Sequence, residues 1–143
     1  LRNIRASGEF VFNHVPEVLA EAMNLTSADF PPDVSEFDWA GLTPVPGVVV
    51  GAPRVAESPA ALECRLRDVR EFGDEPSFLI LGDVVHVSLD PSCMTDGIID
   101  AGRTRPLGRL ARAQYSVSRE LFDMPRPTFR GLLAEGARPR VAR

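Results

Sequence analysis

The residues that could carry out acid, base, nucleophilic or metal chemistry are few in this chain of 143 residues. The histidines are His14 and His86, and the cysteines are Cys64 and Cys93, all far apart along the sequence. A nucleophile elbow needs a Gly-x-Ser-x-Gly turn, and a zinc site needs closely spaced Cys and His ligands. Neither pattern occurs in the sequence. We therefore predict no catalytic side chain and no metal site.

Two loops come closest to a ligand-binding motif. "DPSCMTDG" has two Asp but lacks the oxygen density and order of a calcium loop, and "GVVVGAPR" lacks the Lys-Ser/Thr pair of a phosphate-binding P-loop. Adjacent carboxylates occur only on charged strand faces, which we expect to be solvated. Hydride transfer to a bound flavin needs no protein acid, base or nucleophile, because the cofactor carries the chemistry. A sequence with so little side-chain chemistry is compatible with such a protein.

The elements that would position a ligand are mostly strands. "GEFVFNHV" predicts a strand over residues 9–15 that ends at Pro16. "AALECRLRDVREF" alternates apolar and charged residues, and with "SFLILGDVVHVSLD" beyond the turn "GDEP" it predicts a long hairpin. Gly82 predicts a bulge or a close backbone approach. "VVVGAPRV" predicts a short strand at a sheet edge or a bulge.

Helices are few and short. "LRNIRASG" reads as the last turns of a helix capped by Gly8, so we expect structure before Leu1. "PEVLAEAMNL" predicts a helix that begins at Pro16, and Ser35 would cap another within a long proline-rich connection. The basic tail "RPTFRGLLAEGARPRVAR" is expected to fray. The pattern favours a small antiparallel barrel or sandwich with at least one helix packed on it.

Composition narrows the function classes. A net charge of −4 argues against nucleic acid as the main partner. No apolar run approaches the roughly 20 residues of a membrane span, and no signal peptide is evident, so we expect a soluble, cytoplasmic protein. Cys64 lies in an apolar alternation and is expected to be buried, whereas Cys93 lies in a polar loop.

Five segments in order carry a family resemblance: "RNIRASGEFVFN", "EAMNLTSADFPPDVSEFDWAGLTPVP", "PRVAESPAALECRL", "LILGDVVHV" and "RPLGRLARAQYSV". From about Arg2 to about Pro127 the chain resembles the flavin reductase-like family of FMN-binding split barrels. The resemblance implies a mainly β (α+β) fold, a Greek-key split β-barrel with a few short helices, here without its N-terminal strands. Residues 1–127 would form the C-terminal part of this domain, and residues 128–143 a tail.

The same resemblance implies an FMN-binding oxidoreductase that transfers hydride from NAD(P)H to flavin, as a homodimer with FMN near the interface. Six candidate cofactor-binding residues follow from it: Asn13, Asn24, Thr26, Ser27, Arg109 and Tyr115. Each has a structural alternative. Asn13 could instead hold the local backbone, the next three could cap a helix, and the last two could make an ordinary interface contact.

We predict structural roles, and not ligand contacts, for the remaining polar and aromatic candidates. His14 points away from Asn13 by strand alternation, so we expect it to face a helix or solvent. His86 lies within a predicted strand and is interpreted as a surface or hydrogen-bonded strand residue. Phe37 and Trp39 are expected in the core rather than as a lid that stacks on a ligand.

The chain departs from the family pattern at two points. A Lys/Arg-x-Thr segment that helps to bind the flavin phosphate in the family would lie upstream of Leu1. Many members also have a His at the start of the long strand, where this chain has Ser77. The second departure favours an alternative function, a non-catalytic flavin-binding electron carrier or sensor. The first leaves open an incomplete barrel that binds FMN poorly and tends to associate through unpaired sheet edges.

Overall fold

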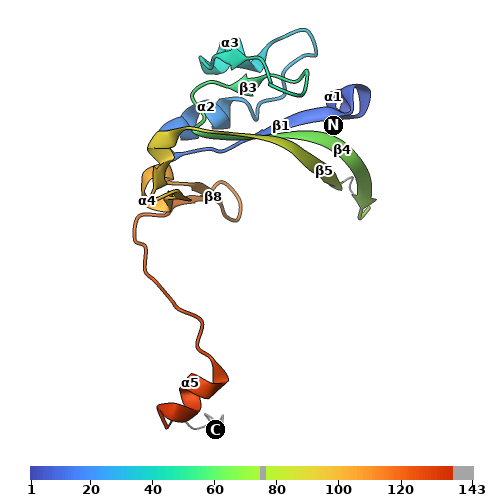
Figure 1. The fold of residues 1–143 in the computed structure, drawn as a ribbon. Coiled ribbons are helices and arrows are strands. Elements are labelled where there is room, and N and C mark those ends of the chain that lie inside the picture. The colour runs from blue at the N-terminus through green and yellow to red at the C-terminus, as the bar shows by residue number, and fades with distance from the viewer. Residues whose placement is uncertain (75–76, 137–143) are drawn as a thin grey trace.

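A three-stranded antiparallel sheet forms the centre of the computed structural model, which describes residues 1–74 and 77–136 (Figure 1). β1 (Glu9–Asn13) pairs with β4 (Ala60–Phe72), and β4 pairs with β5 (Ser77–Leu89) in the order β1-β4-β5. The predicted hairpin is confirmed as the long, curved pair β4–β5. Residues 75–76 of its predicted turn lie outside the described residues.

β1 ends two residues earlier than predicted. His14 N still donates to the Ala60 carbonyl of β4 at 2.8 Å, and the chain then leaves the sheet, because the Val15 carbonyl accepts a hydrogen bond from Leu107 N at 3.0 Å and Pro16 forms a bridge with Pro106. This junction joins the start of the chain to a segment some 90 residues further on. It fixes where the helical segment after Pro16 and the strand after Pro106 begin.

The predicted close approach at Gly82 is confirmed. The β4–β5 register shifts between Leu66 and Asp68, opposite Gly82 and Leu81. A Cβ atom on Gly82 would lie 2.5 Å from Cζ of Phe10, so the phenyl ring occupies the space that a side chain would need. Only glycine lets β1 and β5 pack this closely across β4.

The other strands form three two-stranded ribbons. β2 (Pro44–Val45) pairs with β3 (Arg54–Val55), β6 (Met94–Thr95) with β7 (Ile98–Ile99), and β8 (Leu107–Arg109) with β9 (Tyr115–Val117). Together with the central sheet they confirm the predicted mainly β fold with short helices.

The three helical segments predicted before the tail are confirmed, and η2 (Pro91–Cys93) and α4 (Ala101–Thr104) are present in addition. The confirmed segments are α1 (Arg2–Ser7), η1 (Glu17–Leu19) with α2 (Ala20–Leu25), and α3 (Glu36–Ala40). Gly8 ends α1 with φ 69°, as its predicted capping role requires, and Ser35 precedes α3. The tail contains a helix that was not predicted, α5 (Phe129–Ala134), at whose start the Thr128 hydroxyl accepts a hydrogen bond from Gly131 N. Residues 137–143 of the predicted tail lie outside the described residues.

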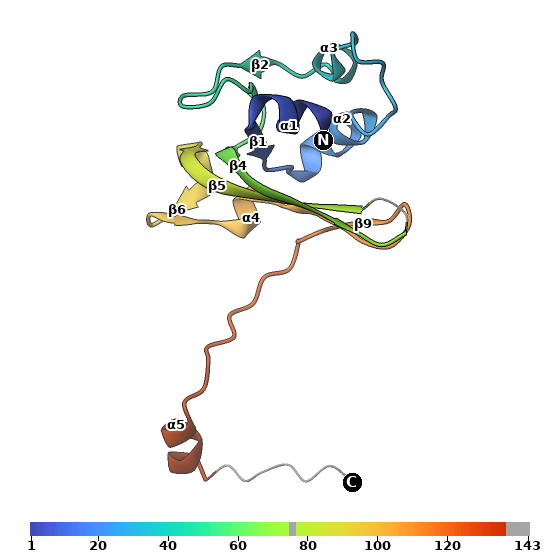
Figure 2. The same cartoon turned by 90° about the vertical axis from the view of Figure 1, so that its right-hand side faces the viewer.

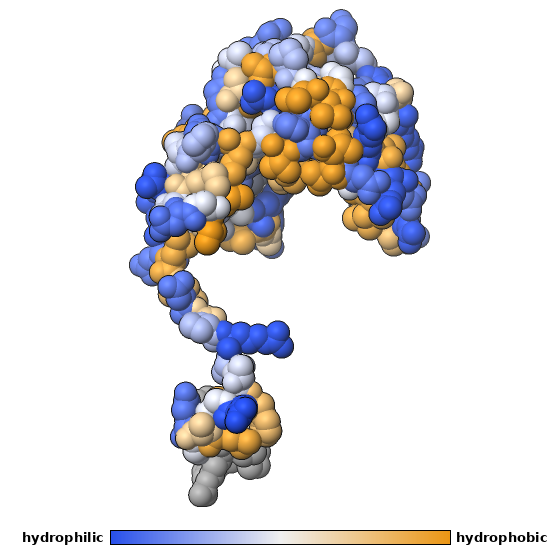
Figure 3. All heavy atoms as spheres, viewed as in Figure 1, coloured by the Kyte–Doolittle hydropathy of each residue, from blue (hydrophilic) through white to orange (hydrophobic). Residues whose placement is uncertain are grey.

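The elements lie in layers about the sheet. α1, α2, α3, β2 and β3 cover one face, while α4 and the β6–β7 and β8–β9 ribbons lie below one end of the other face (Figures 1 and 2). The remaining area around β5 is apolar and open to solvent (Figure 3), with Val84 and Val87 among its exposed side chains. No helix among residues 1–74 and 77–136 has the length and apolar character that a membrane crossing requires.

The buried core is small. Its apolar members are Val50, Ala61, Cys64 and Cys93. Burial raises the pKa of the Cys64 thiol, as expected for a cysteine in an apolar setting. Cys93 lies in a loop region as predicted, but it is buried because η2 folds it inward. The expectation for Trp39 was wrong: its side chain is 69% exposed, with its ring centroid 6.0 Å from that of Phe30.

The contact at Gly82 predicts the effect of a single methyl group. Gly82→Ala should lower the free energy of unfolding by about 1–3 kcal/mol, because the new Cβ collides with the Phe10 ring. Urea denaturation measures the change. Gly51→Ala is the control, since its Cβ would meet only Oε2 of Glu9, at 3.4 Å. Equal urea midpoints for Gly82→Ala and the unmodified protein would contradict the packing described.

Candidate functional site

A cavity of about 480 Å³ lies between α2 and the β8–β9 ribbon. Four of the six candidate residues line it: Asn24, Ser27, Arg109 and Tyr115. We term it the β8 cavity. Its two walls start from the same place, because α2 follows Pro16, and β8 follows Pro106, to which Pro16 is bridged. The junction at the end of β1 therefore positions both walls.

Arg109 and Tyr115 form a fixed pair on one wall of the β8 cavity. Nη1 of Arg109 donates to Oη of Tyr115 at 2.8 Å, and the guanidinium carbon lies 5.4 Å from the centre of the tyrosine ring. Nη2 of Arg109 donates to the carbonyl of Arg112 at 3.2 Å. The guanidinium is thereby held against an aromatic face, an arrangement that suits arginine and not lysine.

Arg112 lines the same cavity and was missed from the sequence. Its φ of 59° places it in the left-handed region, where a residue with a side chain is strained. No sequence signal marks this conformation, because glycine or asparagine would be the expected residue there. The turn between β8 and β9 thus places a second cation beside Arg109 at a conformational cost.

The polar residues at the end of α2 also cap the helix. The Ser27 hydroxyl donates to the Asn24 carbonyl at 2.7 Å, and the Thr26 hydroxyl donates to the Met23 carbonyl at 2.7 Å. This is the capping role considered as the alternative for these residues. Asn24 lines the β8 cavity, and within residues 1–74 and 77–136 its side-chain amide makes no hydrogen bond. The amide is therefore available to a ligand.

Asn13 and Thr26 lie apart from the β8 cavity. They line a second cavity of about 720 Å³, bounded by α1, β1, α3 and residues 51–55 and here termed the β1 cavity, and also a smaller one of about 240 Å³. Oδ1 of Asn13 accepts a hydrogen bond from Val55 N at 3.0 Å, so Asn13 holds the local backbone. Nε2 of His14 lies 3.3 Å from the Thr104 carbonyl, which agrees with the expectation that His14 faces a helix.

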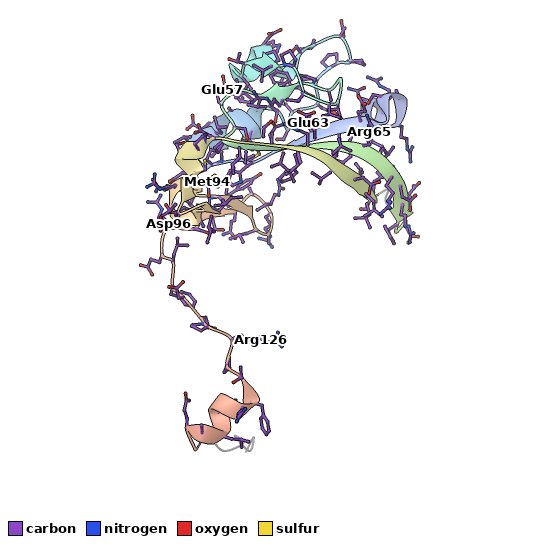
Figure 4. The ribbon with its side chains drawn as sticks, viewed as in Figure 1. Glu57, Glu63, Arg65, Met94, Asp96 and Arg126 are labelled. Atoms are coloured by element: carbon purple, nitrogen blue, oxygen red, sulfur yellow. The ribbon has the colours of Figure 1, made fainter. Side chains whose placement is uncertain are left out.

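The loop that leads into the wall of the β1 cavity is held by a buried carboxylate that the sequence did not reveal. Glu63 of β4 is 0% exposed, and its carboxylate accepts hydrogen bonds from Val48 N (2.7 Å), Val49 N (2.7 Å) and Val50 N (3.0 Å). The expectation that carboxylates on this strand would be solvated was wrong for Glu63, which lies at the centre of the body beneath this loop (Figure 4).

The same contacts correct the predicted strand "VVVGAPRV". Only Arg54–Val55 forms a strand, because the N–H groups of Val48, Val49 and Val50 donate to a side chain and not to a neighbouring strand. Two further carboxylates hold the ends of this loop. Glu9 accepts from Gly51 N at 2.7 Å, and both oxygens of Glu57 lie 3.1 Å from Thr43 N.

The electrostatics of Glu63 follow from these contacts. Burial alone would raise the pKa of the Glu63 carboxyl, but the three backbone N–H donors, together with His86 nearby, outweigh it and hold the pKa below its usual value. Glu63 is therefore a charged, fully hydrogen-bonded group at neutral pH. Its role is to fix the loop in place.

The β8 cavity has the donors for an anionic, partly aromatic ligand. Arg109 and Arg112 outnumber the single carboxylate of Glu21, and Met23 and Leu107 add apolar surface beside the Tyr115 ring. Its volume falls within the roughly 300–1,000 Å³ typical of small-molecule sites. The donor set fits a ligand that carries a phosphate, which needs cations, and a flat ring, which needs aromatic and apolar walls. Among the described residues, no cluster of three or more His, Cys, Asp or Glu side chains could hold a metal ion.

Comparisons with known proteins identify relatives of this chain. Residues 1–107 match the family model of the flavin reductase like domain. A protein of Halalkalibacterium halodurans is 41% identical over 131 residues, which cover 89% of this chain and 63% of that relative. The chain thus spans less than two thirds of that relative's length.

Two solved structures are similar in fold. Nitrilotriacetate monooxygenase component B from Bacillus cereus has a TM-score of 0.80 and 34% identity, covering 86% of this chain and 63% of that one. A Shewanella frigidimarina protein with a split barrel domain has a TM-score of 0.78 and 28% identity, covering 88% and 64%. The predicted split-barrel fold is confirmed by these similarities.

Glu63→Gln should loosen residues 48–50, because the amide places an NH₂ group where a carboxylate oxygen now accepts hydrogen bonds. We expect Tm to fall at pH 7 by about 5 °C or more. The folded-state pKa of Glu63 lies below its unfolded-state value, so the charged carboxylate stabilises the folded protein at pH values above the unfolded-state pKa of about 4.3. This stabilisation is lost as the pH falls through the folded-state pKa. The difference in Tm from the unmodified protein should therefore shrink in acid.

Thermal unfolding followed by circular dichroism across this pH range measures both effects. Arg65→Gln is the matched control, since Arg65 lies on the same strand but is exposed. A Glu63→Gln protein as stable as Arg65→Gln at neutral pH would contradict the role assigned to Glu63.

Proposed function

Because the chain belongs to the flavin reductase-like family, we propose that it is an FMN-binding oxidoreductase that transfers hydride from NADH or NADPH to flavin. The observation that carries this proposal is the β8 cavity, where two candidate residues from the end of α2 and two from the distant β8–β9 ribbon come together beside a second arginine. We further propose that the protein acts as a homodimer with FMN near the interface between subunits.

Each lining residue has a separate role in this proposal. Arg109 and Arg112 hold the phosphate through charge-assisted hydrogen bonds, and the Asn24 amide, which has no partner among the described residues, orients a polar edge of the ligand. Tyr115, Met23 and Leu107 provide the surface against which a flat ring packs. Bound FMN would supply the hydride chemistry, so the chain itself needs no acid, base or nucleophile.

A second candidate function is supported by the start of β5. Many family members have a histidine there that is linked to nicotinamide or substrate handling, and this chain has the exposed Ser77. Without that imidazole, the chain could hold flavin as an electron carrier or sensor that does not turn over nicotinamide. The two candidates share the flavin site and differ in the donor reaction.

Mixing the purified protein with FMN and either NADH or NADPH separates the two candidates. A reductase oxidises at least one nucleotide in a manner that depends on FMN and protein, which a fall in nicotinamide absorbance records. A yellow protein that oxidises neither nucleotide would leave the carrier or sensor function and remove the reductase. A protein that binds no flavin at all would remove both.

Arg112→Gly tests the phosphate contact without a penalty in folding. The change removes a cation and relieves the strain of a positive φ, so stability should be unchanged or higher. The Kd for FMN should rise about 10- to 100-fold, since a hydrogen bond to a charged group contributes about 1.5–3 kcal/mol. Fluorescence titration of the flavin measures Kd.

Riboflavin, which lacks the phosphate, is the control ligand for this variant. Its Kd should be the same for Arg112→Gly and the unmodified protein. An equal loss of affinity for FMN and riboflavin, or no loss for either, would show that Arg112 does not contact the phosphate.

A further inference from the structure

A further cavity, of about 270 Å³, lies between β3 and the end of β5 and is here termed the β3 cavity. Its polar side chains come from two segments: Arg54 and Ser58 from β3 and the turn after it, and Ser88 and Asp90 from the end of β5. It shares no lining residue with the β8 cavity, so it is separate from the proposed flavin site.

The walls of the β3 cavity are fixed by hydrogen bonds. Oγ of Ser58, which is buried, lies 2.7 Å from the His14 carbonyl and 2.8 Å from the Ala60 carbonyl. Asp90 N donates to the Pro59 carbonyl at 2.8 Å, which joins the two segments directly. The polar groups of the cavity are therefore held in place before any ligand arrives, and such preorganisation lowers the entropic cost of binding.

Arg54 contributes a buried donor that has no acceptor. Its Nε is buried, and among residues 1–74 and 77–136 it has no hydrogen-bond partner. In the same part of the chain the guanidinium forms no ion pair. A buried donor without an acceptor is unfavourable, because its lost hydration is not replaced. Water could accept one hydrogen bond from Nε, but only an anionic group would also balance the charge of the guanidinium.

Asp90 brings the opposite charge to the same cavity. Oδ1 of Asp90 accepts a hydrogen bond from Ser92 N at 2.8 Å, and this contact holds the pKa of the Asp90 carboxyl below its usual value. The carboxyl is therefore charged at neutral pH. Within the described parts of the chain, residues 1–74 and 77–136, it forms no ion pair, either with Arg54 or with another residue.

The two charges select among small ligands. A simple anion is attracted by Arg54 but repelled by Asp90, and a simple cation is attracted by Asp90 but repelled by Arg54. A molecule with one carboxylate and one ammonium group satisfies both side chains. The cavity volume lies just below the roughly 300–1,000 Å³ of sites for drug-sized ligands, so the molecule must be small. Free α-amino acids have this charge pattern at neutral pH.

We propose that the β3 cavity binds a small free α-amino acid, whose carboxylate accepts a hydrogen bond from Nε of Arg54 and whose ammonium group pairs with Asp90. The Ser88 hydroxyl can hydrogen-bond to either group of the ligand. A bound amino acid would bridge β3 to the end of β5. Binding at the β3 cavity does not depend on flavin, because the two cavities have no residue in common.

Nuclear magnetic resonance of the ¹⁵N-labelled protein tests the proposal with glycine, L-alanine and L-serine as probes. The Nε–H group of Arg54 gives its own signal, which is identified by its loss in the Arg54→Lys variant. At least one of the three probes should shift this signal and the Ser88 amide signal in a saturable manner. Acetate, which lacks the ammonium group, and ethylammonium, which lacks the carboxylate, should each bind at least about 10-fold more weakly.

Asp90→Asn tests the ammonium contact. The amide oxygen of Asn can still accept from Ser92 N, so the start of η2 keeps its cap while the charge is lost. The Kd of the amino acid should rise at least about 10-fold. Asp96→Asn is the matched control, because it removes the same charge from an exposed residue outside the cavity, at a φ of 51° that asparagine tolerates. Its Kd should equal that of the unmodified protein, and circular dichroism should show that both variants are folded.

Three results would each overturn the proposal. If none of the three amino acids shifts the Arg54 Nε–H signal, the β3 cavity does not bind this class of ligand. If acetate binds as tightly as the amino acids, Arg54 belongs to a plain anion site. If Asp90→Asn and Asp96→Asn have equal Kd values, Asp90 does not contact the ammonium group. Titrations with and without saturating FMN should give the same Kd, so the test of this cavity and the test of flavin binding give separate answers.

Discussion

The contact between the Glu63 carboxylate and three successive backbone N–H groups fixes the loop that leads into the wall of the β1 cavity. A carboxylate removed from water is unfavourable unless hydrogen bonds replace its hydration, and residues 48–50 provide them. Because these residues follow one another, a single side chain fixes both the position and the direction of the loop. Glu9 and Glu57 hold its ends in the same way. Side-chain carboxylates, and not strand pairing, therefore attach this wall to the sheet.

A second constraint, the junction of Pro16 with Pro106, organises the opposite side of the molecule. It ties the end of β1 to the start of β8, so α2 and the β8–β9 ribbon diverge from one point and leave the β8 cavity between them. Asn13 and His14 lie directly before this junction, and their side chains contact the backbone of Val55 and Thr104. The polar end of β1 thus locks neighbouring segments together, while the residues that face the β8 cavity come from α2 and the ribbon.

Features set by nearby residues could be predicted from the sequence, and features set by distant ones could not. Alternation identified the β4–β5 hairpin, and the conformational needs of glycine identified the roles of Gly8 and Gly82. Alternation also placed Glu63 on a charged face, but it carries no information about the loop that covers that face. The apolar residues 48–50 were predicted to form a strand because the local sequence does not show that their N–H groups donate to the distant Glu63. Arg112 escaped notice because its unfavourable φ is visible only in three dimensions, and the basic, proline-containing composition of the tail concealed α5.

The burial of both cysteines has a practical consequence. Cys64 and Cys93 are each only 4% exposed, and burial disfavours the reactive thiolate of Cys64. An alkylating reagent can therefore reach Cys64 only when the sheet opens around it, so the rate of modification of Cys64 measures the frequency of local unfolding in the core. A cysteine introduced at the surface would react much faster than the two buried cysteines, so a fluorophore can be attached at a chosen site without removing the native cysteines.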